Sequence, residues 1–196
     1  MAAIVVPYRG ASGKQRLGPL PDGARTALSL AMLADVLAAC TVVGETVVVT
    51  SDDEGARVAS EFEALLEEDP GGGQGAAVEA ALRRLRNGRT LVVNADLPCV
   101  IPEDLRALES ATPDRGLAFV AARDGTTNAL GLSSPSVFAP LYGPGSAERF
   151  RMHAHTIGVE FVPAGIPNLA DDVDSLEDLE RVEFRIGPRT LAAHTG

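Results

Sequence analysis

The sequence predicts an α/β fold, in which a mostly parallel sheet carries helices on both faces and residues 1–196 form one domain. Short apolar runs without polar alternation, such as residues 3–6 and 46–50, are typical of strands buried on both faces. Segments with helical spacing separate these runs, and strands that alternate with helices indicate a parallel sheet. The length of 196 residues, 45% hydrophobic and 22% charged, suits one globular domain.

The first strand, residues 3–6, is closed by Pro7, and a glycine-rich, basic loop follows at 9–19. Asp22 is expected to cap a helix that runs to about Ala39. The apolar positions of this helix recur at helical spacing and form one core-facing stripe: Leu28, Met32, Leu33, Val36 and Leu37.

The next elements repeat this alternation. Residues 46–50 form a second buried strand, and 51–54 lead from its end into a helix. A weaker, short strand is expected within 64–69. The glycine-rich segment 71–75 is a loop that opens a helix ending at about Arg86.

The third clear strand lies within 89–95, and Pro102 suits the first turn of the helix that follows. Strands are then expected at 117–122 and 129–132. The remaining elements are a helix at 146–155, strands at 159–163 and 169–173, and a helix at 175–183. Ser146 and Ser175 are the expected N-caps of the two helices, and the last ten residues are expected to be peripheral.

Charge excludes some classes of partner. With 17 basic and 27 acidic residues the net charge is −10, which argues against nucleic acid and against anionic membranes. A site for a small anion must therefore carry its own positive charge or recruit a metal ion.

Cysteine usage and hydropathy narrow the class further. Cys40 and Cys99 are far apart and form no CxxC pair, so we expect two small buried side chains, without a disulfide framework or a zinc site. No apolar run approaches the roughly 20 residues of a membrane span, and no leader segment is apparent. The expected location is the cytoplasm.

Ligands of parallel sheets bind beyond the carboxyl ends of the strands, so the loops after the strands are the candidate site. These loops cover residues 9–16, 51–54, 70–75, 96–99, 123–128 and 171–174. They hold many of the glycines and acids and the single lysine.

The first of these loops has the composition of a phosphate site. Arg9, Lys14 and Arg16 supply positive charge, and Gly10 and Gly13 allow backbone amides to approach an anion. No Gly-Lys-Ser/Thr sequence ends the loop, so it is not a Walker loop. The alternative is a solvated loop whose basic side chains face water.

Aspartates in two of the loops that follow predicted strands, 96–99 and 171–174, predict a magnesium site. Asp96 follows a strand directly, and Asp172 and Asp174 project to the same side of an extended segment. Carboxylates in such positions hold Mg²⁺ against a phosphate. The alternatives are a turn-forming Asp96 and solvated acids at 171–174.

Two further groups could contact an anionic substrate. Ser146, as an N-cap after Gly143, would leave free amides in the first helical turn. Asn128 lies near the start of a strand. The alternatives are an ordinary cap and a loop asparagine bonded to its own backbone.

Several segments occur in an order that resembles a known family. In sequence they are Gly13-Lys14-Gln15-Arg16-Leu17, Ala31–Leu37, Val49-Thr50-Ser51-Asp52, Asp96-Leu97-Pro98, Gly125–Leu130, Tyr142–Ser146 and Asp172-Val173-Asp174. The chain thereby resembles, over nearly its whole length, the 2-phospho-L-lactate and phosphoenolpyruvate guanylyltransferases of coenzyme F-420 biosynthesis. The resemblance implies a Rossmann-like, three-layer nucleotide-diphospho-sugar transferase fold, like that of the molybdenum-cofactor guanylyltransferases.

The resemblance also implies an activity: transfer of GMP from GTP to a phosphorylated three-carbon acid, with release of pyrophosphate. It implies Mg²⁺ on Asp96 and on Asp172 or Asp174, with Lys14, Arg16 and Asp96 in catalytic roles. The nucleotide-binding set that it implies is Arg9, Gly13, Lys14, Arg16, Asp52, Gly75 and Asp96. The acceptor-binding set is Asn128, Gly143 and Ser146.

The chain departs from the family at two places. It has Tyr8-Arg9 where members commonly carry a lysine, and Gly73-Gln74-Gly75 where they usually have Leu-Asn. A nucleotidyltransferase with another base or acceptor, such as molybdopterin, 3-phosphoglycerate or a sugar phosphate, is therefore an alternative. A nucleotide-binding module without catalysis is another. A homodimer is open as well, with Phe138 or Phe150 at its interface if either is exposed.

Overall fold

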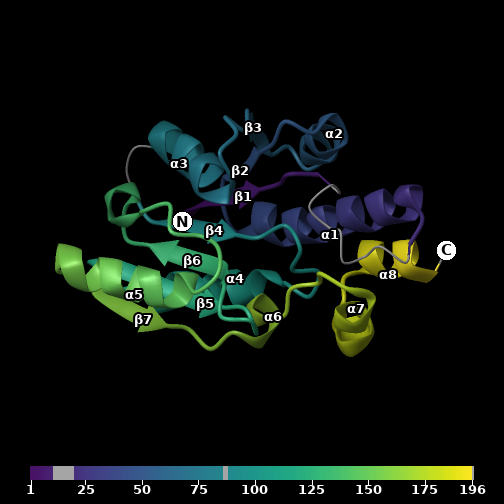
Figure 1. Cartoon of the computed structure of the whole chain (residues 1–196). Helices are drawn as coiled ribbons and strands as arrows, with labels where there is room; N and C mark the ends of the chain where they lie inside the picture. The colour runs from purple at the N-terminus through teal and green to yellow at the C-terminus, as the bar shows by residue number, and fades with distance from the viewer. Residues whose placement is uncertain (11–19, 86–87, 196) are drawn as a thin grey trace.

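One seven-stranded sheet forms the centre of the computed structural model, which describes residues 1–10, 20–85 and 88–195 (Figure 1). Its strand order is β3-β2-β1-β4-β6-β5-β7. The strands are β1 (Ala3–Pro7), β2 (Thr46–Val49), β3 (Leu65–Glu67), β4 (Thr90–Val93), β5 (Gly116–Ala121), β6 (Thr127–Leu132) and β7 (Glu160–Pro163). All strands predicted before residue 169 are confirmed, including the short edge strand β3.

Helices cover both faces of this sheet. They are α1 (Asp22–Val43), α2 (Asp53–Glu61), α3 (Gln74–Leu85), α4 (Pro102–Ala111), α5 (Ser146–Ile157), α6 (Pro167–Ala170), α7 (Leu176–Val182) and α8 (Pro188–Thr195). Short 3-10 turns occur at η3 (Pro135–Val137) and η4 (Glu183–Arg185). Buried residues of α1, α2 and α4 pack on one face and those of α3 and α5 on the other. The predicted three-layer α/β class is therefore confirmed.

The sheet is parallel except around β6. Strand β1 pairs in parallel with β2 and with β4, so that Val5 lies opposite both Val47 and Val92. Strand β6 runs antiparallel to both of its neighbours, β4 and β5. Strand order reverses between β1 and β4, and at such a switch point the loops separate to leave a crevice beyond the carboxyl ends.

Alternating side chains divide the core into two layers. Ile4 and Val6 face the layer of α1, whereas Val5 between them faces the layer of α3 and α5. Phe150 of α5 is fully buried in the second layer, where its ring lies near those of Phe119 and Phe138. Phe138 is partly buried and packs against this layer, so neither of the two phenylalanines is fully exposed.

Three local predictions are wrong at the ends of elements. Asp22 is the first residue of α1 and not its cap, which is Pro21, and α1 continues beyond Ala39 to Val43. Residues 169–173 form no strand, because α6 and an extended segment occupy this stretch. Ser175 is the N-cap of α7 as predicted, since its side chain accepts a hydrogen bond from the amide of Asp178.

The C-terminal residues were expected to be peripheral, and this is wrong, because α8 packs against α1. Asp35 of α1 is buried, and its carboxylate accepts hydrogen bonds from the amide (2.8 Å) and the hydroxyl (2.7 Å) of Thr190. Arg189 lies 3.6 Å from the same carboxylate. A side chain of one helix thus caps the first turn of another, which joins residues far apart in the sequence.

Replacing Asp35 with asparagine should lower the free energy of unfolding by about 1–2 kcal/mol, because one acceptor oxygen and the charge near Arg189 are lost. Urea denaturation measures this loss. Activity per folded molecule should stay unchanged, because Asp35 is not among the residues that line the pocket described below. A variant as stable as the unaltered chain would contradict the role assigned to Asp35.

The expectation that no apolar segment approaches the length of a membrane span is wrong for helix α1. By length and composition alone it is long and apolar enough to cross a membrane, and most of that stretch is buried inside the protein. Its apolar residues pack on the sheet, and its first turns contact Val173 and Leu179. Such a core helix meets the same criterion, so burial accounts for its hydropathy.

Both cysteines are buried, as predicted. Burial raises the pKa of each thiol, that of Cys99 to about 11. A thiol held neutral in this way is a poor nucleophile and metal ligand.

Candidate active site

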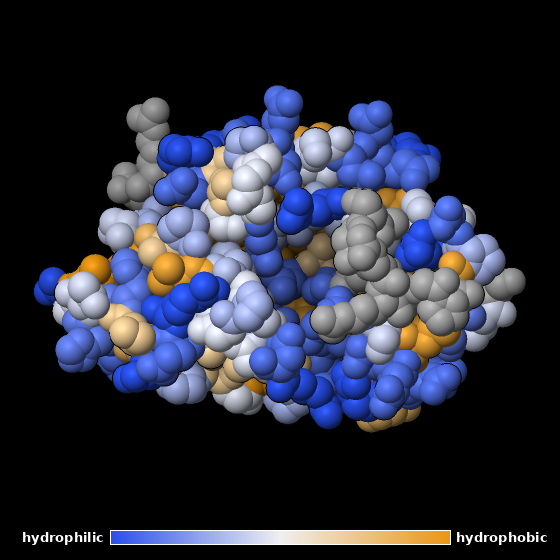
Figure 2. All heavy atoms as spheres, in the orientation of Figure 1, coloured by the Kyte–Doolittle hydropathy of each residue, from blue (hydrophilic) through white to orange (hydrophobic). Residues whose placement is uncertain are grey.

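A pocket of about 230 Å³ opens where the chain leaves β1 and β4, at the switch point of the sheet. Residues from five parts of the sequence line it: Pro7, Tyr8, Arg9, Gly10, Ser29, Met32, Gln74, Asn94, Ala95, Asp96 and Asp174. The face drawn in Figure 2 is hollowed near its centre, and mostly hydrophilic residues border the hollow. The pocket therefore combines apolar and charged side chains and lies where α/β sheets bind their ligands.

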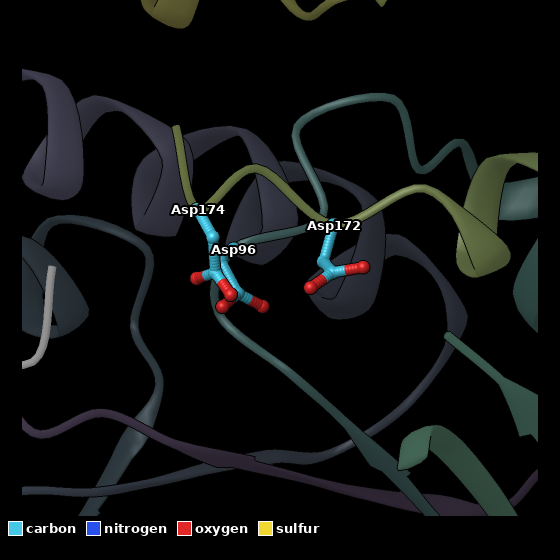
Figure 3. A group of neighbouring side chains, drawn as sticks. All are labelled: Asp96, Asp172 and Asp174. Atoms are coloured by element: carbon cyan, nitrogen blue, oxygen red, sulfur yellow. The ribbon is translucent and has the colours of Figure 1, made fainter. Parts of the chain in front are cut away.

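Three carboxylates meet at this edge of the sheet. Asp96 follows β4, and Asp172 and Asp174 lie on the segment between α6 and α7. One carboxylate oxygen of each lies within 4.8 Å of the others. In Figure 3 the three side chains point in the same direction, with Asp96 and Asp174 nearly superimposed and Asp172 beside them.

Close packing of these acids changes the titration of Asp172. Burial, followed by the charge of Asp96, raises the pKa of Asp172 to about 6, and Asp174 adds to this effect. Asn128 at the start of β6 opposes the shift, because its Nδ2 donates a hydrogen bond to Asp172 Oδ1 at 3.2 Å. The cluster is thus a region of concentrated negative charge that a cation would relieve.

The segment that carries two of the acids alternates in direction. Asp171 and Val173 are buried, whereas Asp172 and Asp174 are partly exposed toward the cluster. The amide of Val173 donates to the carbonyl of Asp96 at 3.0 Å, which ties this segment to the loop after β4. Side chains of an extended segment alternate in this way, so the backbone itself presents the two acids together.

Asp171 belongs to a separate group of charges. Burial acts to raise its pKa, but hydrogen bonds from Arg123 and Arg185 outweigh burial and lower it. Sequence reasoning did not assign a role to these arginines, because they lie 48 and 14 positions away from Asp171.

The basic loop is described only at its start. Arg9 and Gly10 line the pocket, while Gly13, Lys14 and Arg16 lie outside the described residues. Gly10 has a φ of +72°, and a Cβ there would come within 2.8 Å of Asp52 Oδ2, so a glycine is required. Asp52 lies beside this turn and caps α2 by accepting a hydrogen bond from the amide of Gly55 at 2.7 Å.

Two glycines of the predicted site have structural reasons of their own. A Cβ on Gly75 would come within 2.7 Å of Pro140, so this glycine allows α3 to pack closely on the chain before α5. Gly143 has a φ of +105°, which favours glycine, and lies beside Arg149. Neither residue is among those that line the pocket.

Ser146 differs from its predicted role as a cap. Gly145, with a φ of 70°, is the N-cap of α5, and Ser146 is the first residue of the helix and is fully buried. Its hydroxyl lies 2.6 Å from that of Thr127, and its amide donates to the carbonyl of Gly143. The amide of Ala147, in the first turn that was predicted to leave free amides, also donates inside the protein, to the carbonyl of Gly125 at 3.4 Å.

A chain of side-chain amides, which the sequence analysis missed, leads into the pocket. Asn94 Nδ2 donates to the carbonyl oxygen of Thr127 at 3.0 Å, and Gln74 Nε2 donates to Asn94 Oδ1 at 2.6 Å. Since a carbonyl can only accept, this anchor fixes the direction of both amides and leaves Gln74 Oε1 as an acceptor. A polar residue at the end of the buried strand β4 was the available signal for Asn94.

The residue types of the cluster fit a hard divalent cation. Three carboxylates can each supply one oxygen, and Mg²⁺ is bound in proteins by one or two carboxylates together with substrate phosphates. Their mutual repulsion, visible in the raised pKa of Asp172, is relieved by positive charge between them.

Comparison with known proteins shows the family. The family described as "MobA-like NTP transferase domain" matches residues 25–156. A relative from Conexibacter woesei, named phosphoenolpyruvate guanylyltransferase, is 37% identical over 96% of this chain and 89% of its own. A relative of the same name from Streptomyces scabiei is 35% identical over 97% and 94%.

Solved structures show the same fold. A structure from Desulfovibrio desulfuricans G20, assigned to the nucleotide-diphospho-sugar transferases, aligns with a TM-score of 0.76. It covers 94% of this chain and 87% of that chain at 16% identity. At this level of identity the likeness concerns the fold alone.

Proposed function

The chain belongs to the MobA-like NTP transferase domain family, and from this premise we propose that it transfers GMP from GTP to phosphoenolpyruvate in coenzyme F-420 biosynthesis. It is a nucleotidyltransferase, an enzyme of the EC 2.7.7 type. The observation that carries the proposal is the meeting of Asp96, Asp172 and Asp174 at the edge of the pocket beyond β1 and β4. The names of the relatives support guanine and phosphoenolpyruvate.

Asp96, Asp172 and Asp174 are the proposed ligands of Mg²⁺. When bound, Mg²⁺ supplies positive charge that reduces the repulsion between two phosphorylated substrates. Asn128 holds the carboxylate of Asp172 in place, and the bond between Val173 and Asp96 keeps the two loops together.

The basic loop is the proposed site of the triphosphate. Arg9 lines the same pocket as Asp96, and Lys14 and Arg16 follow within the same loop of the sequence. Their charges offset that of the phosphates, and Gly13 allows backbone amides to approach them. Asp52 and Gly75 are proposed to support the nucleotide from the α2 cap and from the start of α3.

The fixed amide of Gln74 supports guanine as the base. Its Oε1 is an acceptor, and guanine presents two neighbouring donors, N1–H and the N2 amino group. Adenine presents an acceptor, N1, beside its amino group. An acceptor that faces another acceptor in the bound complex loses a hydrogen bond, which disfavours ATP.

Replacing Gln74 with leucine should raise KM for GTP about 10-fold and reduce the preference for GTP over ATP, because the fixed acceptor is lost. Steady-state kinetics with both nucleotides measure this. Gln74→Glu is the matched variant: it keeps an acceptor oxygen but cannot donate to Asn94. Unchanged discrimination in Gln74→Leu would contradict the assignment.

The acceptor acid is proposed to bind on the side of β6 and α5. Asn128 lies next to the acid cluster, and Gly143 forms the turn before α5. Because Ser146 is buried, its contribution would come through Thr127, whose hydroxyl it contacts.

The reaction needs little from a general base. An oxygen of the acceptor phosphate attacks the α-phosphorus of GTP, a new P–O bond forms, and the bond to the β-phosphate breaks to release pyrophosphate. The attacking oxygen is already ionised at neutral pH, so no proton has to be removed. No histidine is among the described residues that line the pocket, and charge offset and alignment are the contributions expected of the chain.

Release of pyrophosphate tests the function directly. The purified chain is incubated with Mg²⁺, each of the four NTPs and one of phosphoenolpyruvate, 2-phospho-L-lactate or 3-phosphoglycerate. We expect release with GTP and phosphoenolpyruvate above all other pairs. No release with GTP and any of the three acids would refute the proposal, and nucleotide-dependent stabilisation without turnover would favour a binding module.

The comparisons do not favour the alternative of another base or acceptor. We further propose that residues 1–196 act as one nucleotidyltransferase domain in the cytoplasm. Neither nucleic acid nor membrane is a proposed partner, which agrees with the net charge of −10. A homodimer is proposed as the alternative to a monomer, and sedimentation measures which is present.

A further inference from the structure

A group of three arginines surrounds Asp171, the residue directly before the acid cluster. Its side chain is 8% exposed, and Arg123 Nε donates to Asp171 Oδ1 at 2.7 Å. Arg185 donates to Asp171 Oδ2, and Arg181 lies 3.8 Å from Asp171 Oδ1. We call Asp171, Arg123, Arg181 and Arg185 the arginine anchor.

The residues of the arginine anchor come from separate parts of the fold, which they connect. Arg123 lies in the turn between β5 and β6, Arg181 in α7 and Arg185 in η4. All three contact the carboxylate of Asp171, which therefore joins the turn between β5 and β6 to α7 and η4. The shared carboxylate of Asp171 is only 8% exposed, and charge-assisted hydrogen bonds to such a carboxylate fix geometry more strongly than fully exposed ion pairs do.

The position of the anchor matters because of the alternation along 171–174. Asp171 and Val173 point inward and are held, Asp171 by the arginines and Val173 by its packing and by the carbonyl of Asp96. Asp172 and Asp174, between and after them, point toward the cluster. Fixing the inward residues fixes the direction of the outward ones.

Holding the segment 171–174 in place opposes the electrostatic repulsion among the three carboxylates. Three carboxylates within 4.8 Å repel each other, and repulsion favours separation of the segment from Asp96 when no cation is bound. A segment held only by its own backbone would move apart and would have to be reordered when a cation binds, which lowers affinity.

We propose that Asp171, through Arg123 and Arg185, is a positioning residue that holds Asp172 and Asp174 ready for the divalent cation. This inference rests on the proposed metal site and assigns to that site residues that do not themselves touch the ion. Outer residues that orient the ligands of a metal typically affect its affinity about 10–100-fold.

The test is a titration of each folded variant with Mn²⁺ alone, followed by electron paramagnetic resonance of the free ion. We expect Asp171→Asn to weaken Mn²⁺ binding about 10-fold or more. Arg123→Gln should weaken it by a smaller factor. Because Arg123 is 64% exposed, its replacement should leave folding intact, so this variant reports even if Asp171→Asn folds poorly.

Asp35→Asn is the matched control. Asp35 is also a buried aspartate with an arginine partner, but it joins α1 to α8. The Asp35→Asn substitution should lower the free energy of unfolding and leave Mn²⁺ affinity within twofold of that of the unaltered chain. Equal weakening in this control would mean that general loss of stability explains the effect, and the positioning role would be lost.

Two further outcomes separate this inference from the metal site itself. Mn²⁺ binding that Asp96→Asn removes but Asp171→Asn leaves unchanged would overturn the positioning role and leave the metal site in place. No Mn²⁺ binding by the unaltered chain would overturn both.

Discussion

Replacing Asp96 with asparagine is expected to lower kcat for GMP transfer by roughly 10³-fold, the largest effect of any single substitution in this chain. Asp96 leaves β4 next to the switch point, and its carboxylate meets Asp172 and Asp174. Asparagine keeps the size of the side chain but removes the charge and one anionic oxygen. The remaining two acids would bind a divalent ion weakly and in a different position.

Stability distinguishes this loss from unfolding. Because removing one charge relieves repulsion within the cluster, Asp96→Asn should unfold at an equal or higher temperature than the unaltered chain. The matched control is Asp114→Asn: this side chain is 101% exposed and pairs with Arg89 outside the pocket. The control should keep full activity. Substantial turnover by Asp96→Asn at saturating Mg²⁺ would show that this carboxylate is not a ligand.

Local pattern accounts for most of the fold. Buried strands such as β1 and β2 are visible as continuous apolar runs, because both of their faces are covered. The segment 169–173 begins and ends with apolar residues, and Leu169 and Val173 are indeed buried. They are buried without strand pairing, however, and composition does not distinguish these two ways of burying a side chain.

Long-range contacts explain the other differences. The packing of α8 depends on Asp35, 155 positions before Thr190, and no local pattern indicates which partner an aspartate in a helix has. The cap of α5 shifted from Ser146 to Gly145 because glycine readily adopts the left-handed φ of 70° there. The sequence Gly143-Pro144-Gly145-Ser146 is compatible with an N-cap at Gly145 or at Ser146. The buried contact of Ser146 with Thr127 favours Gly145 as the cap.

The candidate site divides in the same way. The position of Asp96 directly after a predicted strand indicated a role in the site. The alternation of an extended segment indicated that Asp172 and Asp174 share a side. Both predictions were possible because they use only neighbouring residues. The separate role of Asp171 was not visible, since its three arginines come from distant elements. The direction of the Gln74 amide likewise depends on the carbonyl of Thr127, 53 positions away (127 − 74).

Titration of Asp172 predicts an unusual dependence of stability on pH. Its folded pKa of about 6 lies above the ordinary value of 3.8, so the folded chain holds this proton more tightly than the unfolded chain does. The stabilising contribution is complete below pH 3.8 and is lost as the pH rises through 6. At about 1.4 kcal/mol per pKa unit, the metal-free protein loses roughly 2–3 kcal/mol from this group between pH 4 and pH 7.5.

Asp172→Asn removes this loss, because asparagine carries no charge. In the absence of metal, the variant should therefore be more stable than the unaltered chain by roughly 2–3 kcal/mol at pH 7.5 and about equal to it at pH 4. Urea denaturation with a chelator present, at several pH values, measures the difference. A variant that is less stable at pH 7.5 would show that the ionised carboxylate is stabilised by its surroundings, contrary to the arrangement of the cluster.

Magnesium should reverse the order of the two proteins. Cation binding requires the ionised carboxylate, so stabilisation of the unaltered chain by Mg²⁺ should be large at pH 7.5 and should fall about tenfold in binding constant per pH unit below 6. Asp172→Asn should gain little from Mg²⁺ at any pH. The same charge that destabilises the metal-free cluster is thus the one that binds the ion, which is the expected cost of holding an acidic site ready for its cation. Equal gains in both proteins at pH 7.5 would exclude Asp172 as a ligand.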